Sequence, residues 1–336
     1  MSEYSKAESV FDIESLRLSK YATLSKNTKG RIYPIRECDI RTPFSRDRDR
    51  ITHSKAFRRL MHKTQVFLSP AGDHYRTRLT HTFEVTQIAR VIARALNLNE
   101  DLAEAAALGH DLGHTPFGHA GERLLNSLYE GGFSHYEQSL RVVDTLENGG
   151  MGLNLTYEVR DGIRNHAGIN RAVTPEGRII RFADRIAYIN HDIDDAVRAG
   201  ILKNDDIPRE LRNILGDSHG KRIDTMVRDT IENSKNGEIS MSSPIQTATE
   251  RLRDFMFEAV YKNPVAKGEE EKAKTMLSFL YEYFYNNPGK LTEEYRANLD
   301  KYPRGRVVCD YISSMTDRYA VKMFNELFIP KVWQRI

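Results

Sequence analysis

The 336-residue sequence contains few cysteines, few prolines and no long apolar run. Its two cysteines, Cys38 and Cys309, cannot build a disulfide framework or a cysteine-based zinc site, which favours a reducing compartment. No apolar segment approaches the roughly 20 residues that span a bilayer, and the N-terminal residues lack the basic-then-apolar pattern of a signal peptide. We therefore expect a cytoplasmic protein that has no membrane role.

An excess of charge of one sign is also missing. The chain has 50 Lys and Arg residues against 47 Asp and Glu residues, and the formal net charge of +3 is too small to indicate nucleic-acid binding by itself. Hydrophobic residues make up 40% of the chain and charged residues 29%, which is the composition of a globular protein. The length allows one large domain or two modest ones.

Alternation of apolar and polar residues, the pattern of strands, is nearly absent, and helical spacing dominates. Helices are predicted over residues 82–96, from the N-cap Asn99 through Leu108, and from Ile179 to Ala199. Shorter apolar stripes indicate helices over 140–146, before a turn at 148–150, and over 308–323. The sequence therefore predicts an all-α fold, with at most one short hairpin near 171–174.

Two stretches lack a clear helical pattern. Residues 1–50 are polar and irregular and include the charged run Arg46–Arg50, which is typical of a solvated surface. Residues 201–245 are rich in Asn, Asp, Ser and Gly, and we expect a loop or a weakly helical insertion there.

The segment Gly109–Glu122 holds three histidines and two acids in fourteen residues. Its His110-Asp111 pair ends an alanine-rich helix and opens into a glycine-punctuated loop, where neighbouring side chains can converge. The other such pair, His191-Asp192, lies within a predicted helix, where adjacent side chains diverge by about 100°. We therefore place a candidate site at the first pair.

A metal bound through nitrogen and oxygen needs two imidazoles and one or two carboxylates, brought together from different helices. Four residues can supply this set: His81, His110, Asp111 and Asp184. The alternative is that these are surface histidines and structural ion pairs, with Asp184 paired to Arg181 or Arg185.

Several motifs in one order resemble the HD-domain phosphohydrolases, and among them the bacterial deoxyguanosine triphosphate triphosphohydrolase-like proteins. These motifs lie at 41–60, 63–67, 75–81, 108–122, 133–139, 182–188 and 310–319. The resemblance implies an all-α HD-domain helical bundle with a C-terminal helical extension. We expect an irregular segment over 1–50, the HD core over 51–200, and a C-terminal helical region over 201–336 that completes the site.

The resemblance also implies an activity. It implies hydrolysis of deoxynucleoside triphosphates, of dGTP or of several, to the deoxynucleoside and tripolyphosphate, with attack at the α-phosphorus. The four residues named above would hold the metal, with Mn²⁺ or Mg²⁺ expected first and Fe²⁺, Co²⁺, Ni²⁺ or Zn²⁺ also compatible with the ligands.

Further site residues are predicted from the same motifs. His119 is the candidate proton donor to the leaving 5′-oxygen, supported by Glu122 three residues later, and His135 resembles a second active-site histidine. Arg78 resembles the arginine that reaches the α-phosphate, and Gln65, Tyr188 and Asp192 resemble the residues that select the deoxyribose. The alternatives are a loop-stabilising hydrogen bond for His119, a core tyrosine at 188 and surface ion pairing for Asp192.

Other interpretations stay open. His114 suits a supporting role as well as a catalytic one, Lys55 and Arg185 are further candidates for phosphate binding, and the motif over 310–319 either closes the pocket or only docks a helix. Relatives imply a hexamer or tetramer, activation by a second deoxynucleotide, and single-stranded DNA as a partner. The competing functions are an HD-domain nucleotidase acting on deoxynucleoside monophosphates and a nucleotide- or nucleic-acid-binding regulator.

Overall fold

The computed structural model describes residues 10–65 and 75–331, with the side chains of residue 10 and of residues 264–268 left aside. Val66 and Phe67 of the motif at 63–67 lie outside the described residues. Within the described ranges the chain forms helices and isolated β-bridges but no sheet, which confirms the all-α prediction. No helix in these ranges is both long and apolar enough to cross a membrane.

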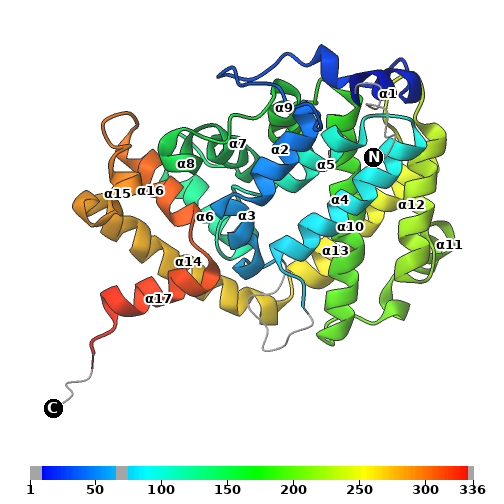
Figure 1. The fold of residues 1–336 in the computed structure, drawn as a ribbon. Helices are drawn as coiled ribbons and strands as arrows, with labels where there is room; N and C mark the ends of the chain where they lie inside the picture. Colours follow the sequence, from blue (N-terminus) through cyan, green and yellow to red (C-terminus); the bar gives the residue numbers. More distant parts are fainter. Residues whose placement is uncertain (1–9, 66–74, 332–336) are drawn as a thin grey trace, which may run out of the picture.

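The helices follow one another as shown in Figure 1. Their bounds are α1 Val10–Arg17, α2 Pro43–Thr52, α3 Lys55–Arg59, α4 Arg78–Ala95, α5 Glu100–Gly109, α6 Gly118–Leu128, α7 His135–Arg141, α8 Glu147–Gly150, α9 Tyr157–Asn165, α10 Pro175–Arg198, α11 Arg209–Leu215, α12 His219–Asn233, α13 Ser243–Met256, α14 Pro264–Asn286, α15 Glu293–Arg296, α16 Arg304–Ser313 and α17 Asp317–Phe328. Two π-helical turns, Val142–Leu146 and Phe257–Tyr261, continue α7 and α13.

Helices α4, α5 and α10 form the centre of the molecule, and their apolar faces share one buried cluster. The prediction of α5 is confirmed, because the Asn99 side chain accepts a hydrogen bond from the Leu102 amide and caps the helix. Helix α4 begins earlier than predicted, at Arg78, because Thr77 and Thr80 form a reciprocal cap. This shift brings His81 into the first turn of α4.

The C-terminal part packs around a second buried cluster, which includes residues of α6, α14 and α16. The apolar stripe over 308–323 is divided between two helices rather than one. Helix α16 ends at Ser313, and Thr316 caps α17 by accepting a hydrogen bond from the Tyr319 amide. In Figure 1, α14 to α17 extend to one side of the central helices, and α11 and α12 lie on the other.

Three sequence expectations are corrected here. Residues 201–245, for which we expected a loop or a weakly helical insertion, form the well-defined helices α11 and α12 and the start of α13, because the apolar residues of α12 are spaced for one buried face. Residues 171–174 form no hairpin and run as an irregular connection into α10. The charged run Arg46–Arg50 lies in α2, where Asp47 is fully buried against Arg31 and Thr156. Residues 10–50 thus include α1 and most of α2.

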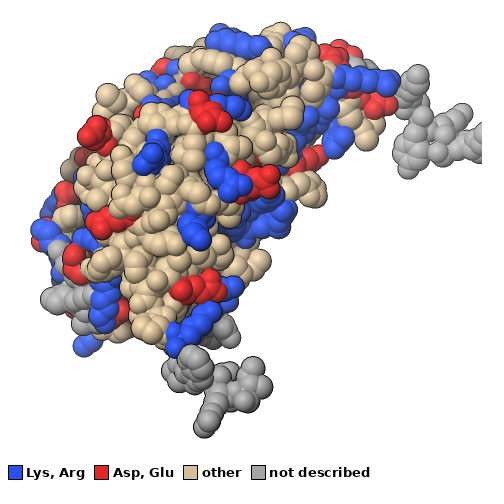
Figure 2. Space-filling model, turned by 90° about the vertical axis from the view of Figure 1, so that its left-hand side faces the viewer, with Lys and Arg blue, Asp and Glu red and all other residues tan. Residues whose placement is uncertain are grey.

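The molecular surface matches the small net charge. On the face in Figure 2, Lys and Arg side chains are interspersed with Asp and Glu side chains, without a continuous stripe of one sign.

Candidate active site

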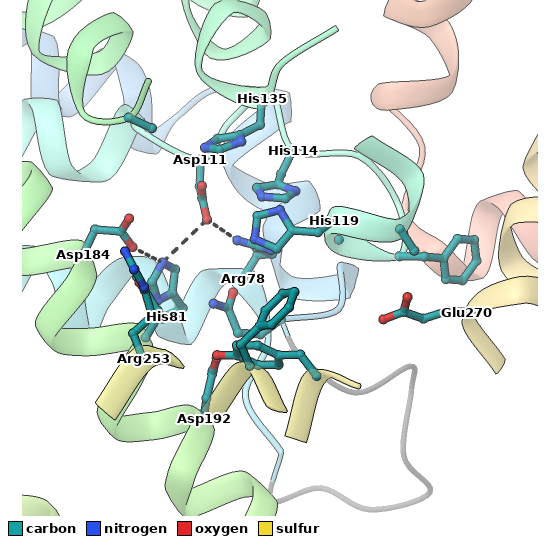
Figure 3. Close-up of a pocket in the computed structure, with 18 of the residues that line it drawn as sticks. Arg78, His81, Asp111, His114, His119, His135, Asp184, Asp192, Arg253 and Glu270 are labelled. Carbon is teal, nitrogen blue, oxygen red and sulfur yellow. Dashed lines mark hydrogen bonds and ion pairs between the residues drawn. The ribbon is translucent and has the colours of Figure 1, made fainter. Parts of the chain in front are cut away.

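The four candidate metal ligands meet at the centre of the molecule, where α4, the segment after α5, and α10 approach each other. Figure 3 shows three of them, His81, Asp111 and Asp184. His81 Nε2 lies 3.2 Å from Asp184 Oδ1 and 3.7 Å from Asp111 Oδ2. His110 Nε2 lies 3.5 Å from Asp111 Oδ1 and 4.0 Å from Asp184 Oδ1. Two imidazoles and two carboxylates from three parts of the chain therefore face one point.

The orientation of His110 fits a metal ligand. Its Nδ1 lies 2.6 Å from the Ala107 carbonyl oxygen, to which it donates, so the lone pair is on Nε2. That Nε2 is buried and has no hydrogen-bond partner among the residues that the structure describes. A buried lone pair that faces two carboxylates is explained by a cation between them. Divalent metals are bound by HD domains, and this cluster is suited to one.

Asp184 is not held by the ion pairs that the alternative interpretation predicted. The Arg181 guanidinium donates instead to backbone carbonyls, at 3.1 Å to His166 and 2.9 Å to Gly168. Asp184 is left facing the two imidazoles.

A second set of side chains lies beside the metal ligands. Glu122 accepts a hydrogen bond from His119 Nδ1 at 3.0 Å and one from His135 Nδ1 at 2.8 Å. Burial would raise the pKa of Glu122, but the charge of His135 and these hydrogen bonds outweigh burial and hold the pKa well below its ordinary value. His119 therefore bonds to a charged carboxylate and not to backbone as the alternative interpretation had it.

His166 belongs to the same network and was missed from the sequence. It follows α9, donates from Nδ1 to the Ile163 carbonyl, and lies with Nε2 3.2 Å from His135 Nε2. Burial lowers the pKa of His166 to about 3, so its ring is neutral and its Nε2 accepts a hydrogen bond from His135 Nε2. Burial also opposes charge on His135, but the neighbouring Glu122 carboxylate outweighs burial and raises the pKa of His135. No motif marked His166, because its partners are distant in sequence.

One cavity of about 560 Å³ joins these groups to the predicted sugar-binding residues. Gln65, Tyr188 and Asp192 line it together with Arg78 and most of the metal-site residues, and the Gln65 Oε1 is buried without a partner in the described part of the chain. Tyr188 also packs against the apolar core, so its side chain contacts both the core and the cavity. The volume lies in the range of ligand pockets.

Asp192 is buried and does not form the surface ion pair of the alternative interpretation. The Tyr261 hydroxyl donates to its carboxylate. Burial raises the pKa of Asp192 to about 6, and burial together with Asp184 raises the pKa of Tyr188 to about 12. Tyr261 and Phe257, on the π-helical turn after α13, line the cavity beside Asp192. They were missed because the aromatic spacing of that turn reads as ordinary core packing.

The predicted cationic residues separate into two groups. Arg78 is buried at the cavity, donating to Asp111 Oδ2 at 2.8 Å and to the Thr64 carbonyl at 3.1 Å. Lys55 lies elsewhere, 3.3 Å from Glu294, and Arg185 is not among the residues that line the cavity. Arg253, which the sequence did not indicate, lines it instead.

The motif over 310–319 does not line the cavity, and its residues contact segments that do. Asp317 accepts hydrogen bonds from the Phe117 amide at 3.0 Å and from the Thr64 amide at 2.9 Å. Asp310 is fully buried and binds the Arg141 guanidinium through both oxygens. The interpretation of a docked helix with buried hydrogen bonds is confirmed.

Comparisons with known proteins agree on one kind of relative, the HD-domain phosphohydrolases. Residues 78–189 match the HD domain, and residues 239–326 match the phosphohydrolase-associated domain. A deoxyguanosinetriphosphate triphosphohydrolase-like protein of Caldanaerobacter subterraneus subsp. tengcongensis is 59% identical over 96% of this chain and 95% of its own length. Proteins of the same description from Clostridium tetani and Clostridium perfringens are 48% and 50% identical over 96% of this chain, and over 96% and 98% of their own lengths.

Proposed function

The chain belongs to the deoxyguanosinetriphosphate triphosphohydrolase-like proteins, a group of HD-domain phosphohydrolases, and from this premise we propose that it hydrolyses deoxynucleoside triphosphates. The proposed substrates are dGTP or several deoxynucleotides, and the products are the deoxynucleoside and tripolyphosphate. Water attacks the α-phosphorus, and the bond from that phosphorus to the 5′-oxygen breaks.

One observation carries the proposal: a single cavity is lined by metal-site residues, a buried arginine, a histidine next to a carboxylate and a set of polar groups suited to a sugar. A metal site alone suits any HD phosphohydrolase. The addition of Gln65, Tyr188 and Asp192 in the same cavity favours a nucleoside as the leaving group.

The residues His81, His110, Asp111 and Asp184 would hold the divalent ion. When bound, such an ion lowers the pKa of a water molecule and polarises phosphoryl oxygens. Mn²⁺ or Mg²⁺ is our first expectation, and Fe²⁺, Co²⁺, Ni²⁺ or Zn²⁺ also suits two imidazoles and two carboxylates. Arg78, held in place by Asp111, presents a guanidinium to the α-phosphate.

The leaving 5′-alkoxide needs a proton, and His119 is the group placed to donate one. It is exposed toward the cavity, and the hydrogen bond from its Nδ1 to Glu122 at 3.0 Å fixes the orientation of its ring. General acid catalysis of this kind contributes roughly 10²- to 10⁴-fold to a rate. His135, which shares the same carboxylate, keeps Glu122 oriented and adds positive charge near the phosphates.

Selection of the sugar rests on α10, where Asp184, Tyr188 and Asp192 are spaced by four residues and share one face. Tyr188 packs where C2′ would lie and leaves no room for a 2′-hydroxyl, while Asp192 and Gln65 bind the 3′-hydroxyl. Assembly as a hexamer or tetramer, activation by a second deoxynucleotide, binding of single-stranded DNA and a cytoplasmic location stay expectations from the family.

The test is turnover of each of the four deoxynucleoside triphosphates, alone and in pairs, with Mn²⁺ or Mg²⁺ and chromatography of the products. We expect deoxynucleoside plus tripolyphosphate, lost in His110→Ala and Asp184→Ala and retained in His53→Ala, which alters an exposed histidine outside the cavity. Activity in mixtures alone would identify an activating nucleotide. Release of phosphate from deoxynucleoside monophosphates, or binding without turnover, would replace the proposal by one of its competitors.

A further inference from the structure

A second group of metal-ligating side chains lies next to the candidate metal site. It consists of His114, His119, Glu122 and His135, and one ligand atom from each lies within 4.8 Å of the other three. None of these residues belongs to the four that the HD site uses. They come from the segment between α5 and α6, from α6, and from the start of α7.

The three imidazoles surround one carboxylate. Glu122 Oε1 lies 2.8 Å from His135 Nδ1, and Oε2 lies 3.0 Å from His119 Nδ1. The His114 ring stacks on the His135 ring at 4.7 Å between centroids and lies 5.2 Å from the His119 ring. In Figure 3, His114 accordingly lies between His135 and His119.

His114 supplies the observation that points to a ligand. The residue is 1% exposed, and its Nδ1 is buried without a hydrogen-bond partner in the described part of the chain. Leaving such an atom unpaired destabilises the folded state, so a native structure rarely keeps one without a reason. An ion bound from solution removes this cost.

The chemistry of the four groups suits one class of ion. The Nδ1 of His114, unpartnered within the described ranges, can offer a lone pair to an ion, together with the ligand atoms of the other three residues. Glu122 stays ionised for the reasons given above. Three imidazoles and one carboxylate form a set typical of Zn²⁺ and Co²⁺, and they are too rich in nitrogen for Mg²⁺ or Ca²⁺.

We propose that His114, His119, Glu122 and His135 bind a second metal ion of the Zn²⁺ class, separate from the ion of the HD site, and that this ion inhibits the enzyme. Binding of the ion releases to solvent the protons that His119 and His135 direct at Glu122. Inhibition follows because His119, once bound to the ion, can no longer deliver a proton to the leaving 5′-oxygen. The inhibition rests on the proposed function, whereas the binding does not.

Another candidate binding site for the ion shares His135 with this group. Asp111, His135 and His166 also bring three ligand atoms within 4.8 Å. In that group His166 Nδ1 is bonded to the Ile163 carbonyl and its Nε2 faces His135 Nε2, so none of its histidine nitrogens is buried without a partner among the described residues. The group with the unpaired His114 Nδ1 is therefore the better site, and His166→Ala is the matched control.

The experiment is calorimetric titration of the metal-free full-length protein with Zn²⁺, together with the visible absorption of the Co²⁺ form. Wild type should bind two equivalents of Zn²⁺. In His114→Ala and in His119→Ala the second equivalent should weaken at least tenfold, and Asp184→Asn should weaken the other one. His166→Ala should still bind two. The His119 side chain is 62% exposed, so His119→Ala tests the site even where His114→Ala fails to fold.

The outcomes separate the two proposals. A single equivalent in wild type, two undiminished equivalents in His119→Ala, or loss of the second equivalent in His166→Ala alone would overturn the second site, whatever the activity. Two equivalents, with the second one stopping hydrolysis by the Mn²⁺-loaded protein, would support both site and inhibition. Two equivalents in a protein that hydrolyses no deoxynucleoside triphosphate would keep the site and remove the proposed function.

Discussion

Replacing Asp317 by alanine should weaken the fold and the active site together, although Asp317 does not line the cavity. Its carboxylate accepts hydrogen bonds from the backbone amides of Thr64, at 2.9 Å, and Phe117, at 3.0 Å. These amides lie next to Gln65 on one side of the cavity and just before Gly118 and His119 on the other. Asp317, the first residue of α17, thus connects this helix to two cavity-lining segments that lie about 200 and 250 residues earlier in the chain.

The magnitude follows from the groups left behind. Each buried amide that loses its acceptor costs about 1–3 kcal/mol, so Asp317→Ala should lower the free energy of unfolding by about 2–6 kcal/mol. Phe117 has a left-handed backbone with φ of 59°, which is strained for a residue with a side chain, and the lost hydrogen bond helps to hold it. Relaxation of this strain moves the start of α6, which carries His119. A displacement of about 1 Å misplaces this side chain relative to the substrate and should reduce kcat roughly 10- to 100-fold.

The assay combines urea unfolding with steady-state turnover of a deoxynucleoside triphosphate. Asp317→Asn, which keeps one acceptor oxygen, should lie between wild type and Asp317→Ala in both measurements. Asp300→Ala removes an exposed carboxylate from the same C-terminal part and should change neither. The reasoning is refuted if Asp317→Ala unfolds within about 0.5 kcal/mol of wild type. It is refuted in its functional part if stability falls while kcat and KM stay unchanged.

Three further predictions concern the cavity itself. His119→Ala should lower kcat roughly 10²- to 10⁴-fold with little change in KM, because the proton donor acts only as the bond breaks; equal losses in kcat and affinity would contradict this. Tyr188→Ala should admit ribonucleoside triphosphates, measured as the ratio of kcat/KM for GTP and dGTP, and an unchanged ratio would place sugar selection elsewhere. Asp192 has a pKa of about 6, above that of an unfolded Asp, so the native state binds more protons between about pH 4 and pH 6 and loses stability as the pH rises through that window. In Asp192→Asn this loss of unfolding free energy, up to about 3 kcal/mol, should be absent. In urea unfolding the variant should therefore be more stable than wild type at pH 7 but not at pH 4, and equal pH profiles of the two proteins would contradict the assignment.

Much of the central fold could be predicted, because its signals are local. Asn99 caps α5 within one turn of its own helix, and the apolar residues of α10 repeat along one face. The same kind of local signal was overlooked in α12. Its buried Met226, Val227 and Thr230 have helical spacing, but the polar residues around them lowered the mean hydropathy of the segment.

The site divides along the same line. The spacing of Asp184, Tyr188 and Asp192 places them on one face from the sequence alone. The contact of Asp184 with His81, and the hydrogen bond from the Phe117 amide to Asp317, depend on residues that are 100 or more positions apart in the sequence. No periodicity carries such information. The ligand requirements of a metal suggested His81 and Asp184 as partners and the family resemblance supported them, whereas nothing anticipated His166 or Tyr261.

The central claim is attack by water at the α-phosphorus with release of the intact tripolyphosphate. The most direct test is turnover of dGTP in ¹⁸O-labelled water, with mass spectrometry of both products. The account predicts one ¹⁸O atom in the tripolyphosphate and none in the deoxyguanosine. Label in the deoxyguanosine would place the attack at carbon, and diphosphate or monophosphate products would show that another bond is broken; either result would contradict the account.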